Sequence, residues 1–126
     1  MKALQLVKYG SDDAIRFAAI ADPSPREGEV LVDVRAAGVN PIDTILREGY
    51  MKDMMPLQFP AILGADFSGT IRELGPGVTG HSVGDQVFGL ANLGRQGSFA
   101  ELLPVSMNAI TAMPKSVSFT EAAAVP

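Results

Sequence analysis

The sequence predicts a mainly β domain, a partly open barrel with one or two short helices. Hydrophobic residues make up 47% of the 126 residues and charged residues 19%, a balance typical of a globular chain rather than a disordered one. Gly and Pro, with 13 and 9 residues, are spread through the chain instead of clustered. The segments between them are short and alternate between apolar and polar residues, which is the period of a β-strand.

The first strands are expected as a hairpin. Lys2 to Lys8 predicts one strand and Ala14 to Ala21 its partner, because Gly, Ser and Asp between them favour a turn. The clearest strand begins at Glu29, where every second residue is apolar and falls on one face: Val30, Val32, Val34 and Ala36. Four further strands are predicted, at Ala65 to Leu74, Gln86 to Leu90, Ser98 to Leu103 and Asn108 to Ala112.

Two short helices are expected between and after these strands. Apolar residues recur at helical spacing from Ile42 to Leu46, with Pro41 in the first turn and Gly49 as the stop signal. Ser118 followed by Glu121 is the pattern of a capping box and predicts a second helix. Met51 to Pro60 has no consistent period and indicates an irregular connection, a kind of segment that often lines a cleft.

Composition disfavours several classes of partner. The formal net charge is −4 and no run of Lys and Arg occurs, which argues against nucleic acid and against a membrane surface. No apolar stretch approaches the roughly 20 residues that a membrane span requires, and the N-terminus lacks the pattern of a signal peptide. We therefore expect a soluble, cytoplasmic protein.

A zinc site is not expected. The chain has no Cys, and His81 is its only His, so the usual nitrogen and sulfur ligands of zinc are almost absent. His81 lies between Gly80 and Ser82 in a turn-rich stretch, where a solvent-exposed side chain is the expected state.

Three stretches together resemble the N-terminal, GroES-like domain of the medium-chain dehydrogenase/reductase superfamily. They are AAGVNPIDTILREGY from Ala36, PAILGADFSGTIRELGPGVTGHSVGDQVFGL from Pro60, and GSFAELLPV from Gly97 leading to PKSVSFTEAAAVP. The resemblance spans residues 1–126 as one GroES-like, substrate-side catalytic domain. In that superfamily a Rossmann nucleotide-binding domain follows, and no G-x-G-x-x-G occurs in this chain. The chain by itself is expected to bind no dinucleotide with useful affinity and to be inactive.

Departures from the zinc-dependent alcohol dehydrogenases indicate the quinone oxidoreductase and enoyl reductase branch. Those enzymes carry a Cys where this chain has Asn40, and His followed by Glu where it has Ala65 and Asp66. They also insert a lobe of four Cys where this chain has only the short loop Ala91 to Gln96. The resemblance therefore implies a zinc-independent enzyme that uses NADPH to reduce quinones or α,β-unsaturated carbonyls.

The resemblance also implies roles for five residues. Without a metal, a hydrogen-bond donor has to stabilise the substrate oxygen, and we expect Asn40 and Tyr50 to be catalytic. Asn40 and Asp43 are expected next to the cofactor, and Tyr50, Met51 and Asp66 next to the substrate.

Each residue also has a structural alternative. Asn40 can cap the following helix, Asp43 can orient its neighbours, and Asp66 can hold a backbone group or an Arg. Tyr50 can lie at the domain rim, and Met51, Met54 and Met55 can simply fill gaps.

Two other functions remain open from the sequence alone. The same fold resembles the subunit of a co-chaperonin ring, so a stand-alone binding or assembly module is one alternative. A member of the enzyme lineage that has lost activity and serves as a scaffold is another. The sequence also leaves a homodimer open as the oligomeric state.

Overall fold

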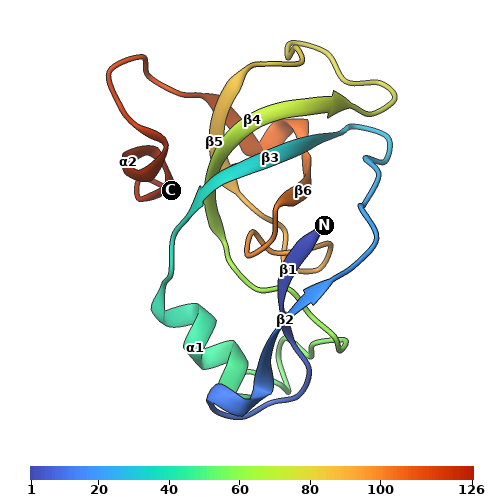
Figure 1. Cartoon of the computed structure of the whole chain (residues 1–126), viewed down its shortest axis with the longest axis vertical. Coiled ribbons are helices and arrows are strands. Elements are labelled where there is room, and N and C mark those ends of the chain that lie inside the picture. Colours follow the sequence, from blue (N-terminus) through green and yellow to red (C-terminus); the bar gives the residue numbers. More distant parts are fainter.

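The computed structural model describes residues 1–126 and confirms the mainly β class. Figure 1 shows the five-stranded sheet at one end of the molecule and α1 with the first hairpin at the other. The elements, in chain order, are β1 (Lys2–Leu6), β2 (Ile15–Ala19), β3 (Glu29–Ala37), α1 (Pro41–Glu48), β4 (Asp66–Leu74), β5 (Gln86–Leu90), β6 (Leu102–Ser106), β7 (Ile110–Ala112) and α2 (Phe119–Ala123). Neither helix is long and apolar enough to cross a membrane.

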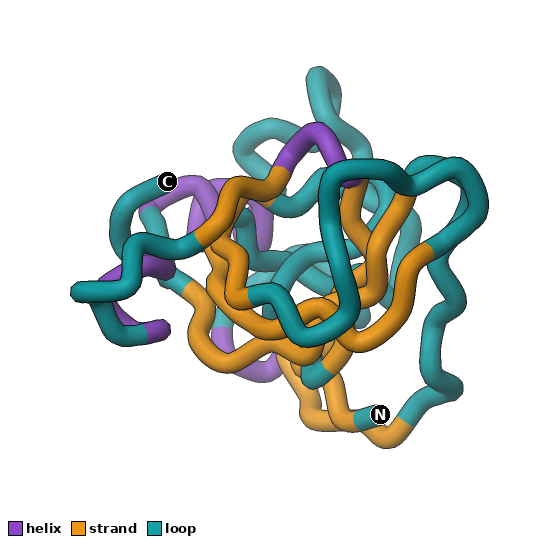
Figure 2. The backbone as a smooth tube through the Cα atoms, turned by 90° about the horizontal axis from the view of Figure 1, so that it is seen from above, coloured by secondary structure: helices purple, strands orange, loops and turns teal.

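All strand pairs are antiparallel, and they form two sheets. β1 pairs with β2, which confirms the predicted hairpin although both strands are shorter than expected. The larger sheet has the order β6-β3-β4-β5-β7. Its strands curve around a common interior when the molecule is viewed from above (Figure 2). Two isolated bridges, Ala3 with Ala100 and Leu6 with Ala61, join the hairpin to the rest of the chain.

The predicted strand from Ser98 to Leu103 is wrong in its placement. The backbone N–H groups of Ser98 and Phe99 donate to Gly64 and Leu63 in a loop, and the strand that pairs with β3 is Leu102–Ser106. The strand expected at Asn108 is also shorter, because a 3₁₀ turn occupies Met107–Ala109. β6 was not predicted at Leu102–Ser106 because Pro104 lies within it, and Pro normally argues against the interior of a strand. Here it lies in an edge strand, where Pro is tolerated.

The interior of the five-stranded sheet is the main hydrophobic core. Its buried members come from five strands and are Val30, Val32, Phe67, Ile71, Val87, Leu103, Val105 and Ile110. The predicted alternation in β3 holds for Val30 and Val32, but Leu31 is buried too, so this end of the strand is covered on both faces. A second, smaller core beneath α1 contains Leu6, Ala14, Leu46 and Leu63.

α1 has both predicted ends, and α2 has the predicted start. α1 starts with Pro41 and ends at Gly49, whose positive φ of 85° is readily adopted by glycine. In α2 the Ser118 hydroxyl oxygen accepts from the Glu121 N–H and the Glu121 carboxylate accepts from the Ser118 N–H, each at 3.1 Å. α2 packs on β3 and β4 through the buried Ala122 and Ala123.

Candidate functional site

The chain brings two of the predicted site residues into direct contact. Asn40 follows β3 in an extended conformation and is the N-cap of α1, while Asp66 is the first residue of β4. The Nδ2 group of Asn40 donates a hydrogen bond to Oδ2 of Asp66 at 2.8 Å. Asp66 is only 7% exposed, so its carboxylate lies almost entirely inside the protein. The two residues are 26 positions apart in the chain, and no pattern in the sequence signalled this contact.

Asp43 supports the same corner from inside the helix. Its Oδ2 accepts from the Asn40 N–H at 2.8 Å, and its Oδ1 accepts from the Gly64 N–H at 3.2 Å. The Asp43 N–H donates to the Asn40 backbone carbonyl at 3.0 Å, and the two residues are the N-cap and N3 positions of a capping box at the start of α1. Because both carboxylate oxygens bind backbone groups, the observed contacts of Asp43 orient α1 and the loop at Gly64.

The pair is packed tightly by residues that the sequence did not single out. The Gly38 N–H and the Ser98 hydroxyl both donate to the Asp66 carbonyl, at 3.1 and 3.0 Å. A Cβ on Gly38 would lie 3.2 Å from both the Asp66 carboxylate and the Ala123 carbonyl. The last turn of α2 therefore lies next to Asp66, and little room remains for the carboxylate to move.

The structure does not bring Tyr50 to this pair. Asn40 precedes the N-terminal end of the eight-residue α1 and Tyr50 follows its C-terminal end, so the whole helix, about 12 Å long at 1.5 Å per residue, lies between them. The Tyr50 side chain is 78% exposed. Met51 is half-buried and packs against the second core, whereas Met54 is exposed. The predicted roles of Tyr50 and Met51 stay predictions.

Tyr9 fixes the irregular segment that follows α1. Its hydroxyl oxygen accepts from the Leu57 N–H at 3.1 Å. Its ring meets the Phe59 ring edge to face, with centroids 4.8 Å apart. A Cβ on Gly49 would also touch this ring, at 3.2 Å. Nothing in the local sequence around Tyr9 pointed to contacts so far along the chain.

His81 has a structural contact. It is half-buried, and its Nε2 lies 3.2 Å from the Met107 carbonyl oxygen, so the expectation of a solvent-exposed side chain was only partly right. The chain contains no group of three or more His, Cys, Asp and Glu side chains placed to hold a metal ion.

The short loop Ala91 to Gln96 is tied to the start of β3 by an ion pair. The Arg95 guanidinium donates to both Glu29 carboxylate oxygens at 3.2 to 3.4 Å and to the Ser24 carbonyl at 3.0 Å. Both side chains of the pair are at most 20% exposed. Burial opposes ionisation of Glu29, but the Arg26 N–H and the Arg95 guanidinium outweigh it and hold the pKa of Glu29 below its ordinary value of 4.5.

This ion pair predicts a pH dependence of stability. The pKa of Glu29 is lower in the folded state than in the unfolded state. The ionised carboxylate therefore makes its full contribution to the free energy of unfolding above the unfolded pKa, and this contribution is lost as pH falls through the folded pKa. We expect Glu29→Gln to flatten the fall in the free energy of unfolding below about pH 5. Urea titrations between about pH 5 and pH 3 would measure it, with the exposed Glu27→Gln as control. Parallel curves for wild type and Glu29→Gln would contradict the assignment.

Comparison with known proteins places the chain in a family. The profile of the alcohol dehydrogenase GroES-like domain matches residues 26–115. The chloroplastic quinone-oxidoreductase homolog of Spinacia oleracea is 34% identical over the whole chain, which spans 39% of that protein. The quinone oxidoreductase of Sus scrofa is 32% identical over 99% of the chain, which spans 37% of that protein.

Solved structures agree with this placement. The human synaptic vesicle membrane protein VAT-1 homolog-like protein superposes with a TM-score of 0.93 at 32% identity, covering all of this chain and 39% of its own. The Escherichia coli quinone oxidoreductase complexed with NADPH superposes with a TM-score of 0.90 at 26% identity, covering all of this chain and 37% of its own. The chain thus spans well under half the length of these relatives. It belongs to the alcohol dehydrogenase GroES-like domain family of the medium-chain dehydrogenase/reductase superfamily, among relatives named as quinone oxidoreductases.

Proposed function

We propose that this chain is the substrate-side domain of a zinc-independent, NADPH-dependent reductase of quinones or α,β-unsaturated carbonyls. The relatives named as quinone oxidoreductases support the reaction class, and the Escherichia coli neighbour in complex with NADPH supports the cofactor. A nucleotide-binding domain outside these residues completes the enzyme in this proposal. The observation that carries it is the hydrogen bond that holds the Asn40 amide against the Asp66 carboxylate.

This contact gives Asn40 a defined orientation. A carboxylate only accepts hydrogen bonds, so the Asn40 group that faces Asp66 has to be the nitrogen. One N–H of that nitrogen is used by Asp66, and the second is left for a ligand oxygen. A fixed donor stabilises negative charge on a substrate oxygen better than a mobile one, because it needs no reorganisation during the reaction. Asp66 acts in this proposal as a positioning residue and not as a substrate contact.

NADPH supplies a hydride when bound, and the polar group of this chain that fits beside it is the Asn40 amide. Asp43 acts indirectly, since both its oxygens hold backbone N–H groups. Tyr50 and Met51 contact the far part of the substrate in this proposal, because Tyr50 lies at the opposite end of α1 from Asn40. A cytoplasmic location stays a prediction, and the spinach relative is chloroplastic.

The test is Asp66→Asn in the chain joined to its nucleotide-binding domain. An amide at position 66 can donate as well as accept, so the Asn40 amide can turn over and lose its donor orientation. We expect kcat/KM for quinones or enones to fall by as much as about a hundredfold, the scale of a small misplacement of a catalytic group. NADPH oxidation with a panel of acceptors measures this, and Asp53→Asn on the exposed segment after α1 is the matched control.

Three results would argue against the proposal in different ways. No turnover with any quinone or enone would contradict the enzyme and favour a scaffold. Wild-type rates in Asp66→Asn would leave the enzyme intact but remove the role of the Asn40–Asp66 pair. A heptamer-sized particle in light scattering would support the co-chaperonin-like assembly module instead.

A further inference from the structure

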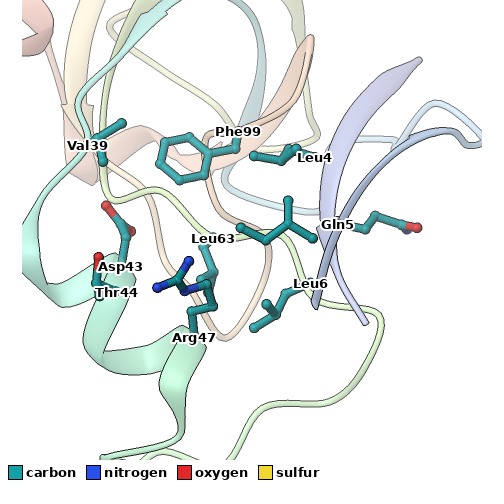
Figure 3. A pocket seen from close by; sticks show the side chains of 10 residues that line it. Leu4, Gln5, Leu6, Val39, Asp43, Thr44, Arg47, Leu63 and Phe99 are labelled. Atoms are coloured by element: carbon teal, nitrogen blue, oxygen red, sulfur yellow. The ribbon is translucent and has the colours of Figure 1, made fainter. Parts of the chain in front are cut away.

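A hollow of about 220 Å³ lies between α1 and the β1–β2 hairpin (Figure 3). One wall is apolar and is built by Leu4, Leu6, Ile15, Val39, Leu63 and Phe99. The opposite wall is the polar face of α1, with Asp43, Thr44 and Arg47. Figure 3 shows the Arg47 guanidinium between these helix side chains and the leucines of β1. An apolar cavity of about 150 Å³ can hold benzene, so this hollow has room for a substituted six-membered ring.

The hollow lies next to the Asn40–Asp66 pair without including either residue, although Asp43 lines the hollow and also accepts from the Asn40 N–H. Val39 lines the hollow, whereas the next residue, Asn40, donates to Asp66. The backbone at Asn40 is extended, with φ of −126° and ψ of 161°, and successive side chains of an extended segment point to opposite sides. A ligand in the hollow therefore contacts the other side of the segment that carries Asn40.

The charges around the hollow disfavour an anionic ligand. The Arg47 guanidinium already binds two carboxylates, Asp12 through Nη1 and Glu48 through Nη2, each at 3.2 Å. The Asp43 carboxylate adds a third negative charge, and its oxygens are occupied by backbone N–H groups. A cation would lose its hydration against the apolar wall, and the positive Arg47 guanidinium that lines the hollow would repel it. A neutral ligand is the class that remains.

Arg47 also carries an unused donor. Its Nε is buried and has no hydrogen-bond partner. Every other buried side-chain nitrogen or oxygen in the chain has one. A buried donor without an acceptor costs about 1 to 3 kcal/mol, so an acceptor oxygen placed there by a small shift of the guanidinium would be favoured. We propose that the hollow binds a small neutral ring compound with one acceptor oxygen, its ring on Leu4, Leu63 and Phe99 and its oxygen toward Arg47. This inference is independent of the proposed reductase activity.

The experiment is a nuclear magnetic resonance titration of this chain with three probes. Cyclohexanone has a ring and an acceptor, methylcyclohexane has the ring alone, and benzoate has a ring and a negative charge. We expect saturable shifts of the Leu4, Leu63 and Phe99 signals with cyclohexanone, about tenfold weaker binding of methylcyclohexane, and none of benzoate. Tenfold corresponds to one hydrogen bond.

Variants of two walls make the test specific. Arg47→Met removes the donor but keeps the length, and cyclohexanone should then bind no better than methylcyclohexane. Leu4→Phe fills the hollow from its half-exposed rim and should abolish binding of both rings. Val83→Phe, at an exposed position that does not line the hollow, should change neither. The proposal is overturned if no neutral ring gives saturable shifts at these residues, if benzoate binds best, or if Leu4→Phe binds as the wild type does.

Discussion

Gly97→Ala is expected to lower the free energy of unfolding by about 3 kcal/mol or more, or to prevent folding. A Cβ at this buried position would lie 2.1 Å from the Leu63 carbonyl oxygen and 2.4 Å from that of Ile62. These are backbone atoms, so no side-chain rotation can make room. The Gly97 N–H also donates to the Ile62 carbonyl at 2.8 Å, which holds the two segments at this distance.

The same loop provides the control. A Cβ on Gly94 would meet only the Asn92 side-chain oxygen, at 3.2 Å, and a side chain can shift. Gly94→Ala should therefore change the urea midpoint much less than Gly97→Ala. Urea unfolding followed by circular dichroism measures both variants. Equal midpoints for Gly97→Ala and wild type would mean that the close approach of residues 62, 63 and 97 is incorrect.

Phe67→Ala should have the second large effect, a loss of about 3 to 5 kcal/mol. Phe67 has no exposed surface and is one of the largest fully buried side chains; it is the second residue of β4 and part of the main core. Removing the ring forfeits its burial and leaves a cavity that strands on both sides cannot close. Phe17 on β2 is 86% exposed, so Phe17→Ala should stay within about 0.5 kcal/mol of wild type.

Thermal and urea unfolding of the two Phe variants provide the measurement. Because the substitution is the same, the difference between them isolates burial. A similar loss in both variants would contradict the assignment of Phe67 to the core and of Phe17 to the surface.

Local signals predicted the elements that depend on local chemistry. Alternation identified β3 and β5, Pro41 and Gly49 bounded α1, and the Ser118–Glu121 capping box identified α2, since each of these patterns acts within a few residues. β6 was misplaced because its partner β3 and its edge position, which decide whether Pro104 is tolerated, are not local properties.

Three of the five predicted site residues lie together in the structure, whereas Tyr50 and Met51 lie elsewhere. Asn40, Asp43 and Asp66 were all named from the sequence, and the structure joins them into one network. Only the structure shows which nitrogen donates to which oxygen in this network. Gly38 and Ser98 were not predicted as site residues. Their role is to donate hydrogen bonds to the Asp66 carbonyl, and this contact depends on the fold and not on the residue types.

The two outer strands of the large sheet bear on how copies of this chain can meet. β6 carries Pro104, which has no N–H to offer, and β7 is only three residues long. Neither margin presents the continuous row of free amides that an incoming strand would need for open-ended stacking into fibrils. Two copies that meet at the large sheet would therefore associate through side chains, and such contacts close on themselves when they are symmetric.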